Sequence, residues 1–214
     1  MAQAKVRANA PNRLIVEGRD DKWSILALTQ LYGWDWDNPQ GHYPYIDDAE
    51  GVDNAVDALP VSVRTYKRVG IVVDADTDQQ SRWDGIKSKL HGVGFTLPAT
   101  PIPDGTVVSM GDKRVGVWLM PNNQSPGKLE DFLAVLVPSR DGCWGWADEA
   151  TKGAAIRGAL FTESDFIKAR IHAWLAWQRE PGLPFGTAIT AALFSHQAAL
   201  AQKFVQWMAQ LYSD

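Results

Sequence analysis

The stretch "RVGIVVDADTD", residues 68–78, decides the fold of this chain. Its apolar run over residues 69–73 is typical of a strand that is buried on both faces, as in a parallel sheet. Three carboxylates follow at alternate positions, Asp74, Asp76 and Asp78. Because carboxylates repel one another, three of them at the exit of a core strand require either a structural role in the turn or a cation. The stretch therefore predicts a strand that ends in a polar site.

A second stretch, "RLIVEG" at residues 13–18, predicts another buried strand, which ends in Glu17 and Gly18. The helix expected after it is capped by Asp20 or Asp21 and stops near Gly33. Strand and helix alternate in this way up to about residue 137. This order predicts an α/β fold with a mostly parallel sheet flanked by helices.

The remaining elements are expected at the following places. A short strand lies near residues 43–46, a helix over residues 51–60 ends at Pro60, and a helix of about four turns follows Asp78. Two β-rich runs around Gly111-Asp112 predict a hairpin. A helix then runs from about Lys128 to Pro138.

Helices dominate the last part of the chain. Residues 139–160 are expected to be irregular, Thr162 and Asp165 form a capping-box pattern for a helix that ends at Pro181, and residues 195–212 are amphipathic. We therefore divide the chain into a core over residues 12–137 and a helical extension over residues 138–214, packed on the same core.

Composition excludes several classes of protein. The chain has 214 residues and a formal net charge of −4, which lacks the basic excess of proteins that grip nucleic acid through its backbone. The single cysteine, Cys143, excludes a disulfide within the chain and a cysteine-based zinc site. No apolar run is long enough to span a membrane, and the first residues lack the apolar centre of a signal peptide. We expect a cytoplasmic protein with no membrane association.

The two strand ends together predict a metal site. In open α/β sheets, sites form at the carboxyl ends of the strands. If the two strands are neighbours, Glu17 faces Asp74 and Asp76, and oxygen ligands in that number suit Mg²⁺ or Mn²⁺. Asp78 is either a further ligand or the cap of the next helix, and the sequence favours neither.

The two stretches "IVEGRDDK", residues 15–22, and "IVVDADTD", residues 71–78, together resemble the Toprim domain. "MPNNQSPGKLEDFL" and "FVQWMAQLY" are similar to a small stand-alone Toprim-related family of unknown function, akin to the OLD-type nucleases of phage defence. The resemblance implies a Toprim-like, Rossmann-like core. It implies that Glu17 is a general acid or base or a metal ligand, that Asp74 and Asp76 hold Mg²⁺, and that Asp78 is the third aspartate of the longer motif.

OLD-like enzymes carry further acids and often a lysine after the second strand. The local candidates are Glu130, as a metal ligand, with Asp131 and Lys128. The alternative is that the two acids occupy the first turn of a helix, where the helix dipole favours them.

These expectations define a Mg²⁺- or Mn²⁺-dependent nuclease that cuts DNA or RNA, with Glu17, Asp74 and Asp76 as catalytic residues, acting as an effector in anti-phage defence. Because the chain has no P-loop pattern, a partner ATPase of the ABC type would be a separate subunit. The alternative is a non-catalytic binding or scaffold subunit of such a split assembly. A phosphoryl-transfer enzyme ranks last, and a homo-oligomer is left open.

Overall fold

The computed structural model describes residues 10–213 and contains one five-stranded sheet. The strands are β1 Asn12–Val16, β2 Tyr45–Asp48, β3 Arg68–Asp74, β4 Thr106–Met110 and β5 Lys113–Met120. Their order is β2-β1-β3-β5-β4, and only β4 runs antiparallel to its neighbour. The predicted α/β class with a mostly parallel, Rossmann-like sheet is confirmed, and so is the hairpin around Gly111-Asp112.

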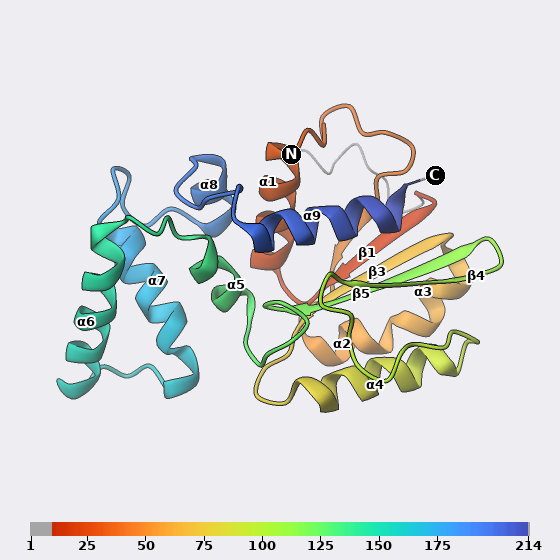
Figure 1. Cartoon of the computed structure of the whole chain (residues 1–214), viewed down its shortest axis with the longest axis horizontal. Coiled ribbons are helices and arrows are strands. Elements are labelled where there is room, and N and C mark those ends of the chain that lie inside the picture. Colours follow the sequence, from red (N-terminus) through yellow and green to blue (C-terminus); the bar gives the residue numbers. More distant parts are fainter. Residues whose placement is uncertain (1–9, 214) are drawn as a thin grey trace.

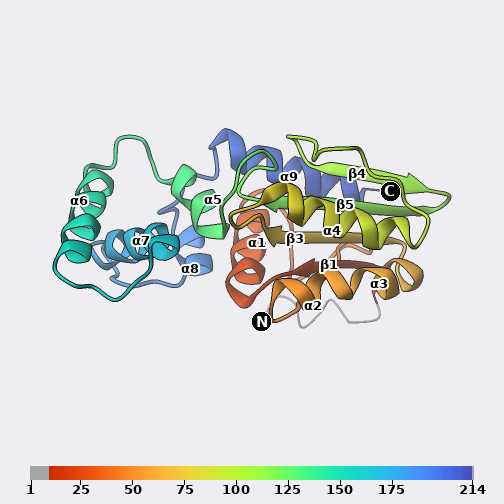
Figure 2. The same cartoon turned by 90° about the horizontal axis from the view of Figure 1, so that it is seen from below.

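Helices cover both faces of this sheet. The helices of the described residues are α1 Arg19–Leu31, α2 Val52–Asp57, α3 Leu59–Thr65, α4 Gln79–His91, α5 Leu129–Leu136, α6 Gly142–Ile156, α7 Phe166–Ala176, α8 Phe185–Thr190 and α9 Ala199–Tyr212, and not all of them lie on the sheet. Figures 1 and 2 show α2, α3 and α4 on one face and α1 and α9 on the other. Alternate strand residues enter the two layers: Ile71 packs in the core under α2–α4, whereas Val72 packs in the core under α1 and α9.

Two glycines allow α9 to lie directly on the sheet. Gly70 of β3 and Gly116 of β5 are paired in register. A Cβ atom at Gly70 would lie 2.6 Å from the Tyr212 hydroxyl oxygen, and one at Gly116 would lie 2.5 Å from Leu211 Cδ2. Arg114 donates to the carbonyl oxygen of Gln210 at 2.7 Å, which fixes the end of the helix. The predicted amphipathic helix is therefore part of the core.

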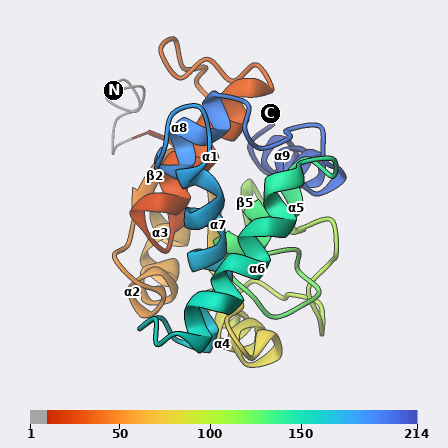
Figure 3. The same cartoon turned by 90° about the vertical axis from the view of Figure 1, so that its left-hand side faces the viewer.

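The segment between α5 and α9 extends past the end of the sheet. Figures 1 and 3 show α6 and α7 as a hairpin beside α5, and we call this hairpin the helical arm. Trp174 and Leu175 of α7 are buried in the same hydrophobic core as the sheet residues Val72 and Trp118. Gly186 of α8 packs so closely on α1 that a Cβ atom there would lie 2.7 Å from the carbonyl oxygen of Trp23.

Several expected boundaries are wrong. Residues 142–156 form α6 instead of irregular structure, because the Asp141 side chain accepts from the backbone N–H groups of Cys143 and Trp144 and caps the helix. Pro60 does not end a helix but sits in the first turn of α3, where a missing N–H costs nothing. The helix after Thr162 begins with a short 3₁₀ turn, Glu163–Asp165, and α7 ends at Ala176, before Pro181.

Candidate active site

The ends of β1 and β3 lie side by side, so the condition on which the predicted site depends, that the two strands are neighbours, is met. The two strands are parallel neighbours, with Val16 paired to Val72. Glu17 follows the first strand and Asp74 ends the second. The backbone N–H of Asp74 donates to Oε2 of Glu17 at 3.2 Å. This bond fixes the glutamate side chain over the end of β3.

The Asp74 side chain connects the sheet to α5. Its Oδ1 accepts from the backbone N–H of Leu129, the first residue of α5, at 3.0 Å. That helix start brings in Glu130, which is only 6 % exposed. Glu130 is close enough to Asp74 to raise its pKa. The candidate glutamate from the sequence therefore joins the two strand-end acids.

A fourth acid, Asp21, was not predicted as a site residue. It lies in the first turn of α1, is 7 % exposed, and its Oδ2 accepts from the Gly18 N–H at 3.1 Å. The N-cap of α1 is Gly18 and not Asp20 or Asp21 as expected, although Asp21 does cap the helix from its third position by accepting from the Gly18 N–H. The other carboxylate oxygen of Asp21, Oδ1, is buried and has no hydrogen-bond partner among the described residues. We call Glu17, Asp21, Asp74 and Glu130 the acid cluster.

Burial and mutual repulsion raise the pKa values of three members of the acid cluster. Burial is the largest cause of the raised pKa of Asp74, which reaches about 8, and Asp21, Glu17 and Glu130 add to it. The pKa of Asp21 rises to about 7, first through burial and then through Glu17. Burial also raises the pKa of Glu17, against the bond from the Asp74 N–H. In the absence of a cation, the acid cluster therefore retains protons near neutral pH.

The chemistry of the acid cluster fits a hard divalent cation, since all its donors are carboxylate oxygens and one of them is an orphaned buried atom. The four side chains do not form a closed set of ligands around such an ion. Within residues 10–213, no three His, Cys, Asp or Glu side chains are grouped so that they could hold a metal. The four acids are thus close enough to repel one another but are not drawn together into a ligand shell.

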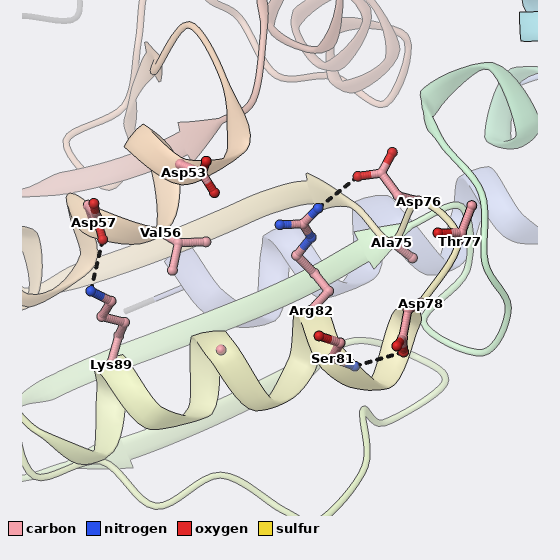
Figure 4. A pocket seen from close by; sticks show the side chains of 11 residues that line it. Asp53, Val56, Asp57, Ala75, Asp76, Thr77, Asp78, Ser81, Arg82 and Lys89 are labelled. Atoms are coloured by element: carbon pink, nitrogen blue, oxygen red, sulfur yellow. Dashed lines mark hydrogen bonds and ion pairs between the residues drawn. The ribbon is translucent and has the colours of Figure 1, made fainter. Parts of the chain in front are cut away.

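Asp76 lies at the border of the acid cluster. Its backbone has φ of 52°, a left-handed conformation, and exchanges two hydrogen bonds with Gly127, at 3.0 Å and 2.8 Å. Its carboxylate pairs with Nη2 of Arg82 at 2.7 Å (Figure 4). Arg82 Nε also donates to the carbonyl oxygen of Asp74 at 3.1 Å. Asp76 is near enough to raise the pKa of Glu17. It therefore faces the acid cluster with its charge already paired.

Asp78 lies apart from the acid cluster. It is the N-cap of α4, and its side chain accepts from the Ser81 N–H at 2.9 Å (Figure 4). With Asp53, Asp57 and Asp76 it lines a cavity of about 630 Å³ between α2 and α4, which we call the open pocket. Of the two interpretations that the sequence left for Asp78, the capping interaction is the one observed.

The other local candidates have structural contacts. Asp131 accepts from the backbone N–H of Lys128 at 2.8 Å in the first turn of α5, which is the arrangement expected of a helix start. Lys128 is close enough to lower the pKa of Glu17. A lysine that the sequence did not single out, Lys168 of α7, pairs with Glu130 at 2.9 Å. No sequence signal places the helical arm beside α5, so Lys168 could not be found in advance.

The sequence contains the pattern that places Asp21 at the site, but we interpreted this residue as a helix cap. In "EGRDDK" it stands four residues after Glu17 and three after Gly18. A helix that starts at the end of β1 must place its third residue over that strand end, beside Glu17. The class of protein that results is an α/β protein with a partly buried carboxylate cluster at the carboxyl ends of its parallel strands.

The chain belongs to the family described as protein of unknown function DUF3226, whose model matches residues 11–213. The match spans the sheet, the helical arm and α9, so all of them belong to the family unit. No curated protein and no solved structure matches the chain. Within the part of the chain that the structure describes, no helix is long and apolar enough to cross a membrane.

Proposed function

We propose that this protein is a Mg²⁺- or Mn²⁺-dependent nuclease whose metal site is the acid cluster. The observation that carries the proposal is the gathering of four carboxylates around the ends of β1 and β3. Asp21 and Glu130 are buried and Glu17 and Asp74 are partly buried, and among the described residues Oδ1 of Asp21 has no hydrogen-bond partner. A buried acid group of this kind costs stability unless something compensates it. Binding sites of α/β sheets also form at this end of the strands.

Three members of the acid cluster would have direct roles in the reaction. Asp74 and Asp21 would bind the cation most directly, since they are the acids whose pKa values burial raises most. Glu17 would hold or transfer a proton at its free carboxylate oxygen. Bound metal would stabilise charge on a phosphate and activate an attacking water. Lys128 and Arg82 would hold the phosphate in place, since both are close enough to Glu17 to lower its pKa.

The resemblance to the Toprim pattern supports this proposal, because its glutamate and first aspartate, Glu17 and Asp74, are the two residues joined by a hydrogen bond. Asp76, the second aspartate, would join the ligands after leaving Arg82. The broader proposals follow from the resemblance: an OLD-like effector in anti-phage defence, acting on DNA or RNA, with a separate ABC-type ATPase as partner.

A second candidate function is a non-catalytic subunit of such an assembly. The observation in its favour is that the carboxylates already have partners inside the protein: Asp76 with Arg82, Glu130 with Lys168, and Asp78 with the N-terminus of α4. In that case the acids stabilise turns and helix starts, and the protein binds no divalent cation.

Cleavage assays separate the two candidates. Wild-type protein, Glu17→Ala and the control Asp57→Ala in the open pocket are incubated with plasmid, linear DNA and total RNA, each with Mn²⁺ or with EDTA. The nuclease proposal expects Mn²⁺-dependent cleavage of one polymer by wild type and Asp57→Ala but not by Glu17→Ala. Cleavage that persists in EDTA or in a folded Glu17→Ala protein contradicts it, and absence of both cleavage and Mn²⁺ binding favours the scaffold.

A further inference from the structure

The helical arm places a positive charge at the acid cluster. Lys168 lies in the first turn of α7, and its Nζ is 2.9 Å from Oε1 of Glu130. The two partners differ in exposure: the lysine side chain is 49 % exposed, whereas the glutamate side chain is 7 % exposed. An ammonium group at the surface thus neutralises a carboxylate that is enclosed in the protein.

Glu130 is also joined to the rest of the acid cluster through the chain, because the N–H of the preceding residue, Leu129, donates to Oδ1 of Asp74 at 3.0 Å. It is close enough to raise the pKa of both Asp21 and Asp74. A cation that is held by Asp21 and Asp74 would therefore also act on Glu130. Lysine carries one compact positive charge, and a divalent cation carries two, so both satisfy the same carboxylate through charge alone.

We propose that Lys168 is the resident counter-ion of Glu130 and competes with a divalent cation, so that metal binding to the acid cluster displaces the Lys168 ammonium. This inference rests on the proposed function, because it takes the acid cluster as the metal site. It couples two parts of the chain, because the positive charge of Lys168 in the helical arm lowers the affinity of the acid cluster for a metal ion. Such a coupling is reciprocal, so metal binding weakens the ion pair as much as the ion pair weakens metal binding.

Calorimetric titration of the full chain with MnCl₂ tests the competition. The variants are Lys168→Met and the matched control Lys203→Met, which removes an exposed lysine that pairs with Asp104 at 2.7 Å. Removal of the competing charge should tighten Mn²⁺ binding about two- to fivefold in Lys168→Met, which corresponds to the ~0.4–1 kcal/mol of an ion pair with an exposed partner. Lys203→Met should bind Mn²⁺ as wild type does.

A second measurement needs no substitution. Acetylation of lysines in the wild-type protein, read by mass spectrometry, should become about twofold or more faster at Lys168 on addition of Mn²⁺, and should not change at Lys203. Equal or weaker Mn²⁺ binding by Lys168→Met, or unchanged acetylation of Lys168 under saturating Mn²⁺, overturns the competition. If wild type and Lys168→Met both bind no Mn²⁺, the metal site itself is disproved, and that result is distinct from unaltered binding in the variant.

Discussion

The acid cluster and the open pocket contain the same kind of residue in nearly the same place, yet they differ in environment. Both lie at the end of β3, and each contains four carboxylates. In the acid cluster, burial and neighbouring acids raise the pKa values of Glu17, Asp21 and Asp74. In the open pocket, Asp57 and Asp76 have cationic partners, Lys89 and Arg82, and Asp57 is largely exposed.

This difference shows that the number of acidic residues in a region does not by itself make the region a metal site. An exposed carboxylate paired with lysine contributes about 0.2–1 kcal/mol, and water stabilises its charge in any case. Asp21 and Asp74 are removed from water and lie beside other carboxylates, so their environment favours a proton or a cation. The environment of the acid cluster therefore favours a proton or a cation, whereas the acids of the open pocket have water or a cationic side chain.

The largest expected effect is the loss of catalysis in Asp74→Asn. Asparagine keeps the shape and can still accept from the Leu129 N–H, but it removes the charge that would bind the cation. We expect Mn²⁺-dependent cleavage to fall about a thousandfold, since metal-based stabilisation of the reacting phosphate is worth several kcal/mol. The matched change in the open pocket, Asp57→Asn, should keep cleavage within about twofold of wild type. Comparable losses in both variants would remove the distinction between the two regions.

The second expected effect is on the pH dependence of stability. The folded-state pKa values of Asp74 and Asp21, about 8 and about 7, are above the ordinary value of 3.8, so the folded protein binds more protons than the unfolded chain. Their contribution to stability is complete below pH 3.8 and is lost as the pH rises through 7 and 8. In EDTA, the free energy of unfolding should therefore fall with rising pH, with a slope of at most ~1.4 kcal/mol per pH unit for each group.

Urea unfolding at several pH values measures this slope. Asp74→Asn should make it shallower, because one of the two titrating groups is gone, whereas Asp57→Asn should leave it unchanged. Added Mn²⁺ should restore stability at high pH, since a cation that binds only the folded state stabilises it. A free energy of unfolding that increases between neutral and alkaline pH would contradict the assignment of raised pKa values to the acid cluster.

The sequence was sufficient to predict the mostly parallel sheet and the two strands that end in acids. The apolar run over residues 69–73 has to be buried on both faces, and its neighbour ends in Glu17, so their meeting at one edge follows from parallel pairing. The boundaries that failed depend on short-range contacts that override composition. Asp141 caps a helix in a segment rich in glycine and tryptophan, and Pro60 is accepted in the first turn of α3.

The rest of the site depends on tertiary packing that local sequence does not encode. Glu130 was a candidate because OLD-like enzymes carry further acids after the second strand, but its burial comes from the packing of α5 against the sheet and α7. Lys168 reaches it only because the helical arm folds back beside α5 (Figure 3). Asp21 was interpreted as a cap because acids in a first turn commonly are caps. Its unpaired oxygen atom is visible only in the folded protein.

The smallest expected effect concerns Asp78, the one aspartate of "DADTD" for which capping and metal binding were equally favoured by the sequence. Its side chain accepts from the Ser81 N–H at 2.9 Å, and loss of an N-cap costs about 1 kcal/mol. Asp78→Ala should therefore lower the free energy of unfolding by about this amount. It should leave the Mn²⁺ affinity unaltered, because Asp78 belongs to the open pocket and not to the acid cluster. Asp78→Ser, which keeps an acceptor but no charge, should recover most of the lost stability, as serine is also a good cap. If Mn²⁺ affinity falls in both variants while stability recovers in the serine variant, the charge of Asp78 contributes to metal binding. Asp78 then belongs to the acid cluster as well as to the open pocket.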